Sequence, residues 1–305
     1  MEFYMVLPYS PLNNSTLGLV TGDLIAQRQV DSQRTSWSGD SALTLATISS
    51  LSYGYNLTDM MDRYLSWYQA GEYTKHSKKP MTVGSTTTFA LDKYKRTSDP
   101  FNSGGRELSD NGNGALMHIT PVILYLRSQY GEDFVSHEPA MLMLHQITGL
   151  THNHPQSLIA SGLYAMLVNN ILQNMPLIEA VDQAVSGSYE YYSQHQIFAQ
   201  FLPAFQALNK PDLKSESIES LHTSGYVVDT LATTIWVILN STSFENAISL
   251  TQTLPGESER IMPLVGSLAG ILYHQEFLER YSTNDKELAI VMDVLHIANK
   301  SHNFN

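Results

Sequence analysis

The sequence contains no cysteine, which excludes disulfide bonds, thiolate nucleophiles and thiolate-bound zinc. Basic residues are also few: 17 Lys and Arg stand against 29 Asp and Glu, so the formal net charge is −12. Proteins that track nucleic acid or an anionic membrane need basic surfaces, and this balance argues against both classes. A local pocket for one small nucleotide remains compatible with it.

Long apolar runs are absent as well. No stretch reaches the length of about 18 consecutive apolar residues that a membrane span needs. The opening residues, MEFYMVLPYSPLNNS, lack the basic start and apolar run of a secretory signal. We therefore expect a soluble, cytoplasmic protein.

Alternating strand patterns joined by hairpin signals are missing too, whereas apolar residues recur at helical spacing along much of the chain. The segments that we predict as helices are 40–52, 57–71, 153–174, 176–192, 226–240, 243–254, 263–281 and 284–300. Gly266 and Gly270 should let their helix pack closely against a neighbour. No repeat or low-complexity linker divides the chain, so we predict one all-α domain over 1–305, a compact multi-helix bundle.

A carboxylate-rich stretch, LPGESERIMPLVG, covers residues 254–266. Pro263 belongs in a first helical turn, so the helix should begin near 259–262 and leave Glu257 and Glu259 on the loop before it. On a loop both carboxylates can turn toward one ligand, such as a metal ion. The alternative is a solvated acidic loop with a surface ion pair to Arg260.

Four other stretches place polar residues just ahead of helices. SWSGDSALTLA (36–46) offers Ser38 and Asp40, as ligands or as helix caps. DNGNGALMHITPV (110–122) holds a glycine turn whose backbone amides can bind a phosphate or sugar. LTHNHPQS (150–157) carries His152 and His154, which make a poor zinc site because no thiols are nearby. SGYVVDTLATTIW (224–236) begins with Ser224, Gly225 and Tyr226.

Taken in order, these stretches resemble the motifs of the ADP-ribosylglycohydrolase family. GLVTGD (18–23) is similar to the family's GxxxGD, and WSGDS (37–41) to its Trp-[Ser/Thr]-Asp-Asp-Thr. The segment 71–91 resembles one ending in Gly-Asn-Thr-Thr, with Ser85 in the Asn position, and NGNGALMHITPV resembles GNGxLMRxxPV, with His118 replacing Arg. LTHNHP, SGYVVDTLATTIW and LPGESERIMPLVGSLAG complete a match from about residue 18 to 273.

The resemblance implies an all-α fold, an ADP-ribose-type ligand and a site with two magnesium ions. In the family, the Ser/Thr and two Asp of the first motif and two Asp and a Thr of the last hold the metals. They touch the ribose hydroxyls and activate water while the C1–N or C1–O bond breaks.

The sequence departs from the family in that ligand set. Ser38 and Asp40 are kept, but Gly39 replaces the first Asp, Glu257 and Glu259 replace the last two, and Arg260 replaces the closing Thr. Three carboxylates and one guanidinium sum to −2, which balances one Mg²⁺ but not two. We therefore expect at most one magnesium ion or none, with Ser38, Asp40, Glu257 and Glu259 as its ligands. Arg260 would take the place of the other ion.

The resemblance also implies roles for single residues. Asp40, Glu257, Glu259 and Asp110 are the catalytic candidates, although Asp110 could instead cap a helix. Substrate contacts are expected from Gly112, Asn113, Gly114, His152, Ser224, Gly225, Tyr226 and Arg260. Asn113 could instead be only a turn residue, His152 a cap and Tyr226 a core residue. Asp23 is expected to hold helix ends, and Trp37, Trp67 and Trp236 to lie in the core.

Two functions follow from these motifs and departures. One is an altered hydrolase that cleaves an N- or O-glycosidic bond at C1 of a ribose. The other is a non-catalytic relative that binds an ADP-ribose-like molecule or docks a protein. The expected partner is a small ADP-ribose-like molecule or an ADP-ribosylated macromolecule; the acceptor and the oligomeric state are left open.

Overall fold

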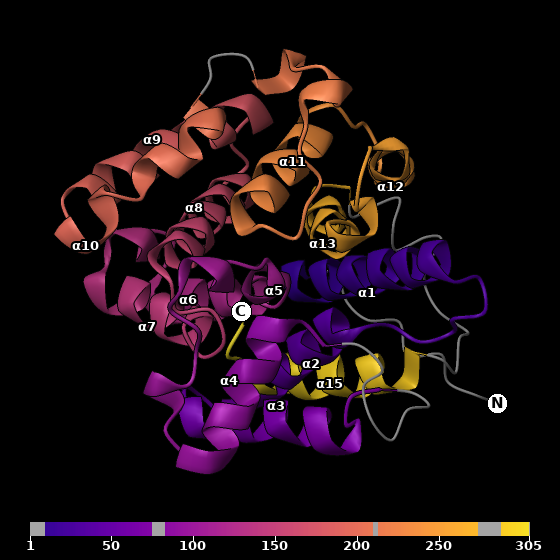
Figure 1. Ribbon diagram of the computed structural model, residues 1–305, viewed down its shortest axis with the longest axis vertical. Helices are drawn as coiled ribbons and strands as arrows, with labels where there is room; N and C mark the ends of the chain where they lie inside the picture. Colours follow the sequence, from indigo (N-terminus) through magenta and orange to yellow (C-terminus); the bar gives the residue numbers. More distant parts are fainter. Residues whose placement is uncertain (1–9, 75–82, 210–212, 274–287, 305) are drawn as a thin grey trace.

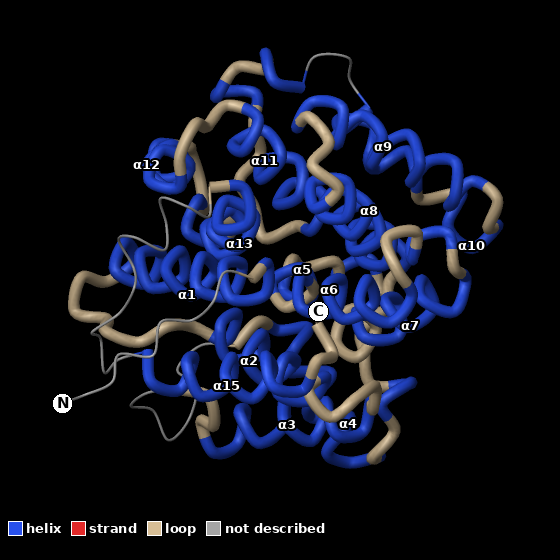
Figure 2. Tube along the Cα trace, turned by 180° about the vertical axis from the view of Figure 1, so that it is seen from behind, coloured by secondary structure: helices blue, strands red, loops and turns tan. Residues whose placement is uncertain are grey.

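The computed structural model describes residues 10–74, 83–209, 213–273 and 288–304. Within these ranges the chain forms helices and loops and contains no β-strand (Figure 2). Two isolated backbone bridges, Gly105 with His152 and Gly112 with Tyr226, are the only strand-like pairings of the described residues. The all-α prediction is therefore confirmed.

The α-helices follow one another along the chain with short 3₁₀ turns between several of them. Their bounds are α1 Pro11–Val30, α2 Gly39–Leu51, α3 Leu57–Ala70, α4 Ser85–Thr97, α5 Gly114–Met117, α6 Thr120–Tyr130, α7 Glu138–Thr148, α8 Pro155–Leu172, α9 Leu177–Ser193, α10 Gln196–Ala199, α11 Val227–Leu239, α12 Phe244–Thr253, α13 Met262–Leu272 and α15 Ala289–Ser301.

Six of the predicted helices appear within about two residues of their expected ends, and α13 begins where Pro263 predicted. The continuous helix predicted over 263–281 is wrong, because α13 ends at Leu272 and Tyr273 is its C-cap. The Tyr273 hydroxyl lies 2.8 Å from the Ser241 carbonyl oxygen, which anchors the chain there. Residues 274–281 and 284–287 lie outside the described ranges. The prediction missed α1, α4, α6, α7 and the short α10.

Helix α1 crosses the middle of the molecule and packs along α13 (Figure 1). Glycines face one another where the two helices touch. A Cβ atom on Gly18 would lie 2.2 Å from the Gly266 carbonyl oxygen, and one on Gly270 would lie 2.3 Å from the Asn14 carbonyl oxygen. Both distances are below van der Waals contact, so only glycine allows the two backbones to come this close.

Two groups of helices lie on either side of α1 in Figures 1 and 2. Helices α8, α9 and α11 occupy one side, and α2, α3, α4 and α15 the other. Helix α8 is buried on nearly all faces, between α7, α9 and α11. Trp37, Trp67 and Trp236 are all buried, as predicted. None of the helices described here is both long and apolar enough to cross a membrane.

Candidate functional site

The glycine turn at 111–114 and the start of α11 are joined through their backbones. The Asn113 N–H donates to the Gly225 carbonyl oxygen at 2.9 Å, and the Val227 N–H donates to the Asn111 carbonyl oxygen at 2.9 Å. Residues more than a hundred positions apart are thus fixed side by side. The structure therefore brings Gly112, Asn113 and Gly114 together with Gly225 and Tyr226.

His152 lies against this turn and is almost completely buried. A Cβ atom on Gly114 would be 3.0 Å from His152 Cε1, and one on Gly112 would be 3.4 Å from Nε2, so small residues are needed beside the ring. Burial lowers the pKa of His152 to about 4, although the nearby Asp110 carboxylate opposes the shift. The imidazole is therefore neutral at pH 7 and can offer a hydrogen bond but no positive charge.

Several predicted contact residues have structural partners in this structure. Asp110 Oδ2 accepts a hydrogen bond from the Glu107 N–H at 2.9 Å, which completes a capping box around a 3₁₀ turn. The Asn113 side-chain amide donates to Thr230 Oγ1 and to the Arg260 carbonyl oxygen, both at 3.0 Å. Asp110 therefore acts as a cap here, and the Asn113 side chain ties the turn to α11 and to the loop that carries Arg260.

The residues ahead of α11 are organised in the same way. Ser224 Oγ donates to Asp229 Oδ2 at 2.7 Å and accepts from the Tyr226 N–H at 3.0 Å. Tyr226 is only partly buried and is the N-cap residue of α11. This local network fixes the backbone of Gly225, which faces the neighbouring loop that carries Arg260.

The N-terminus of α2 forms the acidic part of the site. Ser38 is the N-cap residue, and its hydroxyl accepts a hydrogen bond from the Asp40 N–H at 3.1 Å. The same hydroxyl donates to Asp23 Oδ2 at 2.9 Å. Desolvation and the neighbouring Asp23 raise the pKa of Asp40 to about 7, although the Ser38 hydrogen bond and the Arg260 charge oppose the shift.

Arg260 connects the acidic end of the site to the glycine turn. Its Nη2 lies 2.9 Å from Glu257 Oε1, and both side chains are about half exposed. Its Nη1 would be 3.0 Å from a Cβ atom on Gly225, so the guanidinium lies over that glycine. An ion pair between Arg260 and this acidic loop was expected, and Glu257 is its partner. The guanidinium is half exposed and paired with a carboxylate, so it is neither fully buried nor free in solvent.

The side chains present do not fit a centre for two magnesium ions. Among the described residues, no group of three or more His, Asp or Glu side chains is placed to hold a metal ion. The Ser38 hydroxyl is bound to Asp23, and Glu257 is paired with Arg260. Whether one ion binds to Ser38, Asp40, Glu257 and Glu259 stays a prediction.

Position 39, where the family has its first Asp and this chain has Gly39, has no room for a side chain. A Cβ atom on Gly39 would lie 2.7 and 2.8 Å from two ring carbons of Trp67. Trp67 is fully buried, so its ring has little room to move. An indole therefore lies where a side chain at position 39 would begin, and an aspartate there would require repacking.

Two residues near the turn had no assigned role in the sequence prediction. Thr87 Oγ1, in α4, would lie 3.5 Å from a Cβ atom on Gly114, so the segment around Ser85 does reach the site. His118 is fully buried beside Tyr64, and neither ring nitrogen has a hydrogen-bond partner among the described residues. Burial and His152 lower the pKa of His118 to about 3. The replacement of Arg at position 118 signalled an unusual site but not this burial.

Three curated enzymes are similar in sequence to this chain. The chain is 24% identical over 240 residues to the ADP-ribosylarginine hydrolase Tri1 of Serratia proteamaculans (strain 568), a match covering 78% of this chain and 59% of that protein. Tri1 of Pseudomonas putida (strain GB-1) is also 24% identical, over 241 residues that cover 78% of this chain and 58% of that protein. The ADP-ribosyl-[dinitrogen reductase] glycohydrolase of Rhodospirillum rubrum is 25% identical over 221 residues, which cover 72% of this chain and 62% of that protein. The chain thus spans less than two thirds of the length of these relatives.

A solved structure shows the same fold, and a family profile identifies the family. The fold matches a chain of an ADP-ribosylglycohydrolase-related protein complex with a TM-score of 0.69 and 22% identity, over 96% of both chains. The sequence profile of one family, ADP-ribosylglycohydrolase, matches residues 9–287, nearly the whole chain. On this evidence, the chain belongs to the ADP-ribosylglycohydrolase family.

Proposed function

We propose that this protein binds an ADP-ribose-type ligand and hydrolyses an N- or O-glycosidic bond at C1 of its ribose. The observation that carries the proposal is the backbone pairing of the 111–113 turn with 225–227 over a buried, neutral His152. This pairing holds the glycine-rich turn in place, with the Arg260 guanidinium beside Gly225. Backbone amides and a guanidinium suit the phosphates and hydroxyls of ADP-ribose.

The reaction needs no redox partner. Water adds its oxygen to C1 as the C1–N or C1–O bond breaks, and the leaving group takes up a proton. The products are free ADP-ribose, or the related ribosyl compound, and the released acceptor. The named activities of the relatives, on ADP-ribosylarginine and on ADP-ribosyl-[dinitrogen reductase], make a protein-linked ADP-ribose one candidate substrate.

Arg260 is proposed to act as a fixed cation in the site. It lies within electrostatic reach of Asp40, pairs with Glu257 and remains half exposed, so a ligand can approach it. A guanidinium can hold a phosphate or a ribose hydroxyl by directed hydrogen bonds. Because it cannot acidify a bound water as a metal does, catalysis would be slower than at a two-metal centre.

A second candidate function is ADP-ribose binding without cleavage. The Arg260–Glu257 pair and the Trp67 ring beside Gly39 favour it, since both oppose assembly of a two-metal centre. Binding needs only the glycine turn, His152 and Arg260. A protein-docking scaffold with no ligand site is the remaining alternative.

The experiment that separates these functions is titration with ADP-ribose, with Mg²⁺ and with chelator, followed by calorimetry and thermal unfolding. A ligand that binds only the folded state raises the melting temperature. Release of ADP-ribose from ADP-ribosylarginine and from an ADP-ribosylated peptide is measured in parallel. Binding with release supports the hydrolase, binding without release supports the binder, and no binding overturns both.

A further inference from the structure

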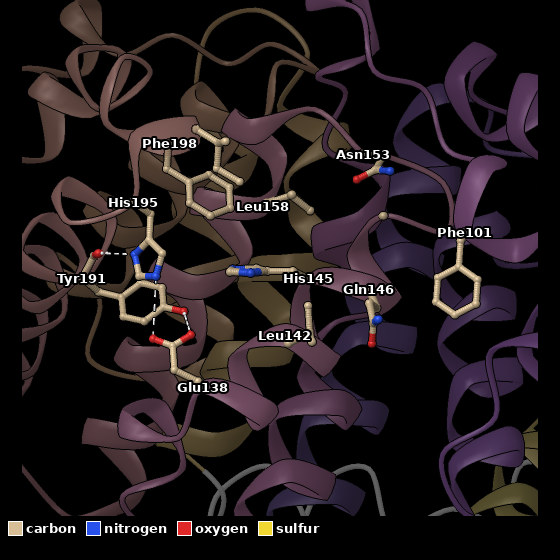
Figure 3. Close-up of a pocket in the computed structure, with 12 residues that line it drawn as sticks. Phe101, Glu138, Leu142, His145, Gln146, Asn153, Leu158, Tyr191, His195 and Phe198 are labelled. Atoms are coloured by element: carbon tan, nitrogen blue, oxygen red, sulfur yellow. Dashed lines mark hydrogen bonds and ion pairs between the residues drawn. The ribbon is translucent and has the colours of Figure 1, made fainter.

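A pocket lies outside the candidate site, between α7, α9 and α10. Its volume is about 390 Å³, within the range of small-molecule sites. Figure 3 shows Glu138, Tyr191 and His195 gathered on one side of it and Phe101 on the other. His145 and Phe198 lie between them and contact each other, with ring centroids 5.3 Å apart.

The rim of this pocket is unusually apolar for a protein surface. The described residues include nine large hydrophobic side chains that are exposed, and three of them line this one pocket. These are Phe101 (56% exposed), Leu142 (56%) and Ile197 (65%). Apolar side chains that gather around a hollow are typical of a binding site, whereas single exposed ones are ordinary.

The polar end of the pocket presents hydrogen-bond acceptors. His195 Nδ1 lies 2.8 Å from the Tyr191 carbonyl oxygen, which can only accept, so Nδ1 carries the proton. The other ring nitrogen, Nε2, lies 3.7 Å from Glu138 Oε1, beyond hydrogen-bond distance. An incoming donor can therefore bind this carboxylate oxygen directly.

The charges around the pocket favour a cation. None of the described residues that line it is Lys or Arg, and the Glu138 side chain is 67% exposed. The other Glu138 oxygen accepts a hydrogen bond from the Tyr191 hydroxyl at 3.1 Å, which holds the carboxylate in place. Burial, reinforced by His195, lowers the pKa of His145 to about 4, so this ring is uncharged at neutral pH and does not repel a cation.

We propose that this pocket binds a small primary amine with an aromatic or branched apolar group. The ammonium group donates a hydrogen bond to Glu138 Oε1. The apolar group contacts Phe198 and Leu142. The Glu138 carboxylate thus selects ligands with a positive charge, and the apolar rim selects ligands with an apolar group.

The pocket is not the ADP-ribose site, although the two share a wall. His152 contacts the glycine turn, whereas the next residue, Asn153, lines the pocket. The Asn153 N–H donates to the Gly105 carbonyl oxygen at 2.7 Å, which ties this segment to the strand-like stretch before Asp110. His152 therefore faces the glycine turn of the candidate site, and Asn153 faces the pocket.

The test is calorimetric titration of the whole chain with three probes that share one ring: phenethylamine, 2-phenylethanol and 3-phenylpropanoate. We expect phenethylamine to bind with a dissociation constant of roughly millimolar or below, the alcohol more weakly and the carboxylate not measurably. Equal binding of amine and carboxylate, or no binding of the amine, overturns the proposal.

Two variants locate the binding. Glu138→Gln keeps an acceptor for Tyr191 but removes the charge, so it should weaken phenethylamine about tenfold and the alcohol less than about twofold. Leu142→Ser should weaken both. Ile178→Ser, an equally exposed side chain outside the pocket (57%), is the matched control and should change neither. Unchanged amine affinity in Glu138→Gln rejects the assigned position, and ADP-ribose binding should be unaffected in all three variants.

Discussion

The carboxylate of Asp23, in the middle of α1, accepts a hydrogen bond of 2.6 Å from the hydroxyl of Ser41 in α2. The same oxygen accepts from the Ser41 N–H and from the N–H and hydroxyl of Ser38. A buried acid on one helix therefore caps another helix, whose first turn carries Asp40. Sequence analysis expected Asp23 to hold helix ends, and this is confirmed.

We predict that Asp23→Ala lowers the free energy of unfolding by about 2–4 kcal/mol, because four donors lose their acceptor in a buried place. Asp23→Asn keeps one acceptor oxygen and should cost less than half as much. Asp31→Ala, which removes an exposed acid at the end of α1, is the control and should change stability by about 0.5 kcal/mol or less. Urea unfolding measures all three; equal effects of Asp23→Ala and Asp31→Ala would contradict the capping role.

Replacing Gly18 by alanine should destabilise the protein by about 3 kcal/mol, because the new Cβ would meet the Gly266 carbonyl oxygen at 2.2 Å and force α1 from α13. Gly187→Ala is the matched control within α9. There the Cβ would lie 3.6 Å from Met166 Sδ, an ordinary contact, and the gain in helix propensity should stabilise by up to about 1 kcal/mol. Thermal unfolding of the two variants should move in opposite directions, and a neutral Gly18→Ala would refute the close contact.

Asp40→Asn should stabilise the protein at pH 8 by about 1–3 kcal/mol. The pKa of Asp40 is raised from 3.8 to about 7, so between these values the unfolded state binds fewer protons than the folded state. Stability therefore falls as pH rises through this window, and the amide removes that loss. The gain should be complete above about pH 7, shrink as pH falls and vanish below about pH 4. Unfolding in chelator at several pH values tests this, and a gain independent of pH would contradict it.

Gly39→Ala should cost about 2–3 kcal/mol, because the added Cβ would overlap the buried Trp67 ring. Trp67→Leu alone should also destabilise, by leaving a cavity. The double variant should cost less than the two single costs added together, because the smaller side chain makes room for the Cβ. A double-mutant cycle by urea unfolding measures this difference, and strict additivity would show that the two residues do not compete for space.

Arg260→Gln should leave stability nearly unchanged, since exposed ion pairs contribute at most about 1 kcal/mol. It should weaken ADP-ribose binding about tenfold or more if the guanidinium contacts the ligand. Glu257→Gln is the matched control because it breaks the same pair from the other side and frees the guanidinium. Its affinity should be unchanged or higher, so equal losses in the two variants would reject Arg260 as a ligand contact.

Much of the fold could be predicted from local sequence. Helix α3 has an apolar stripe on one face and ends at Gly71 in a left-handed conformation, as its pattern indicated. Helix α1 was missed because its buried face is rich in small and polar residues, including Asn13, Asn14, Ser15 and Thr16, which do not form a hydrophobic stripe. Burial of polar residues depends on what packs against them, and local periodicity does not report it.

The candidate site was predicted in part. The order of its motifs placed the right segments together, and Arg260 was expected to pair with Glu257, Glu259 or Asp40. The roles of Asp110 and Asn113 were ambiguous, because a cap and a ligand contact use the same residue types. The burial of His118 and the contact of Trp67 with Gly39 were not foreseen, since each depends on helices from different parts of the chain.

Helix periodicity, caps and motif order are encoded by neighbouring residues, so the helical fold and the family can be read from the chain alone. Which side chains meet depends on the packed structure: Arg260 lies over Gly225, Trp67 against Gly39, and Glu138 faces His195. Such contacts are set by how the helices pack and rotate against one another. Those packing angles come from the sum of many weak interactions across the whole core, which no single motif contains.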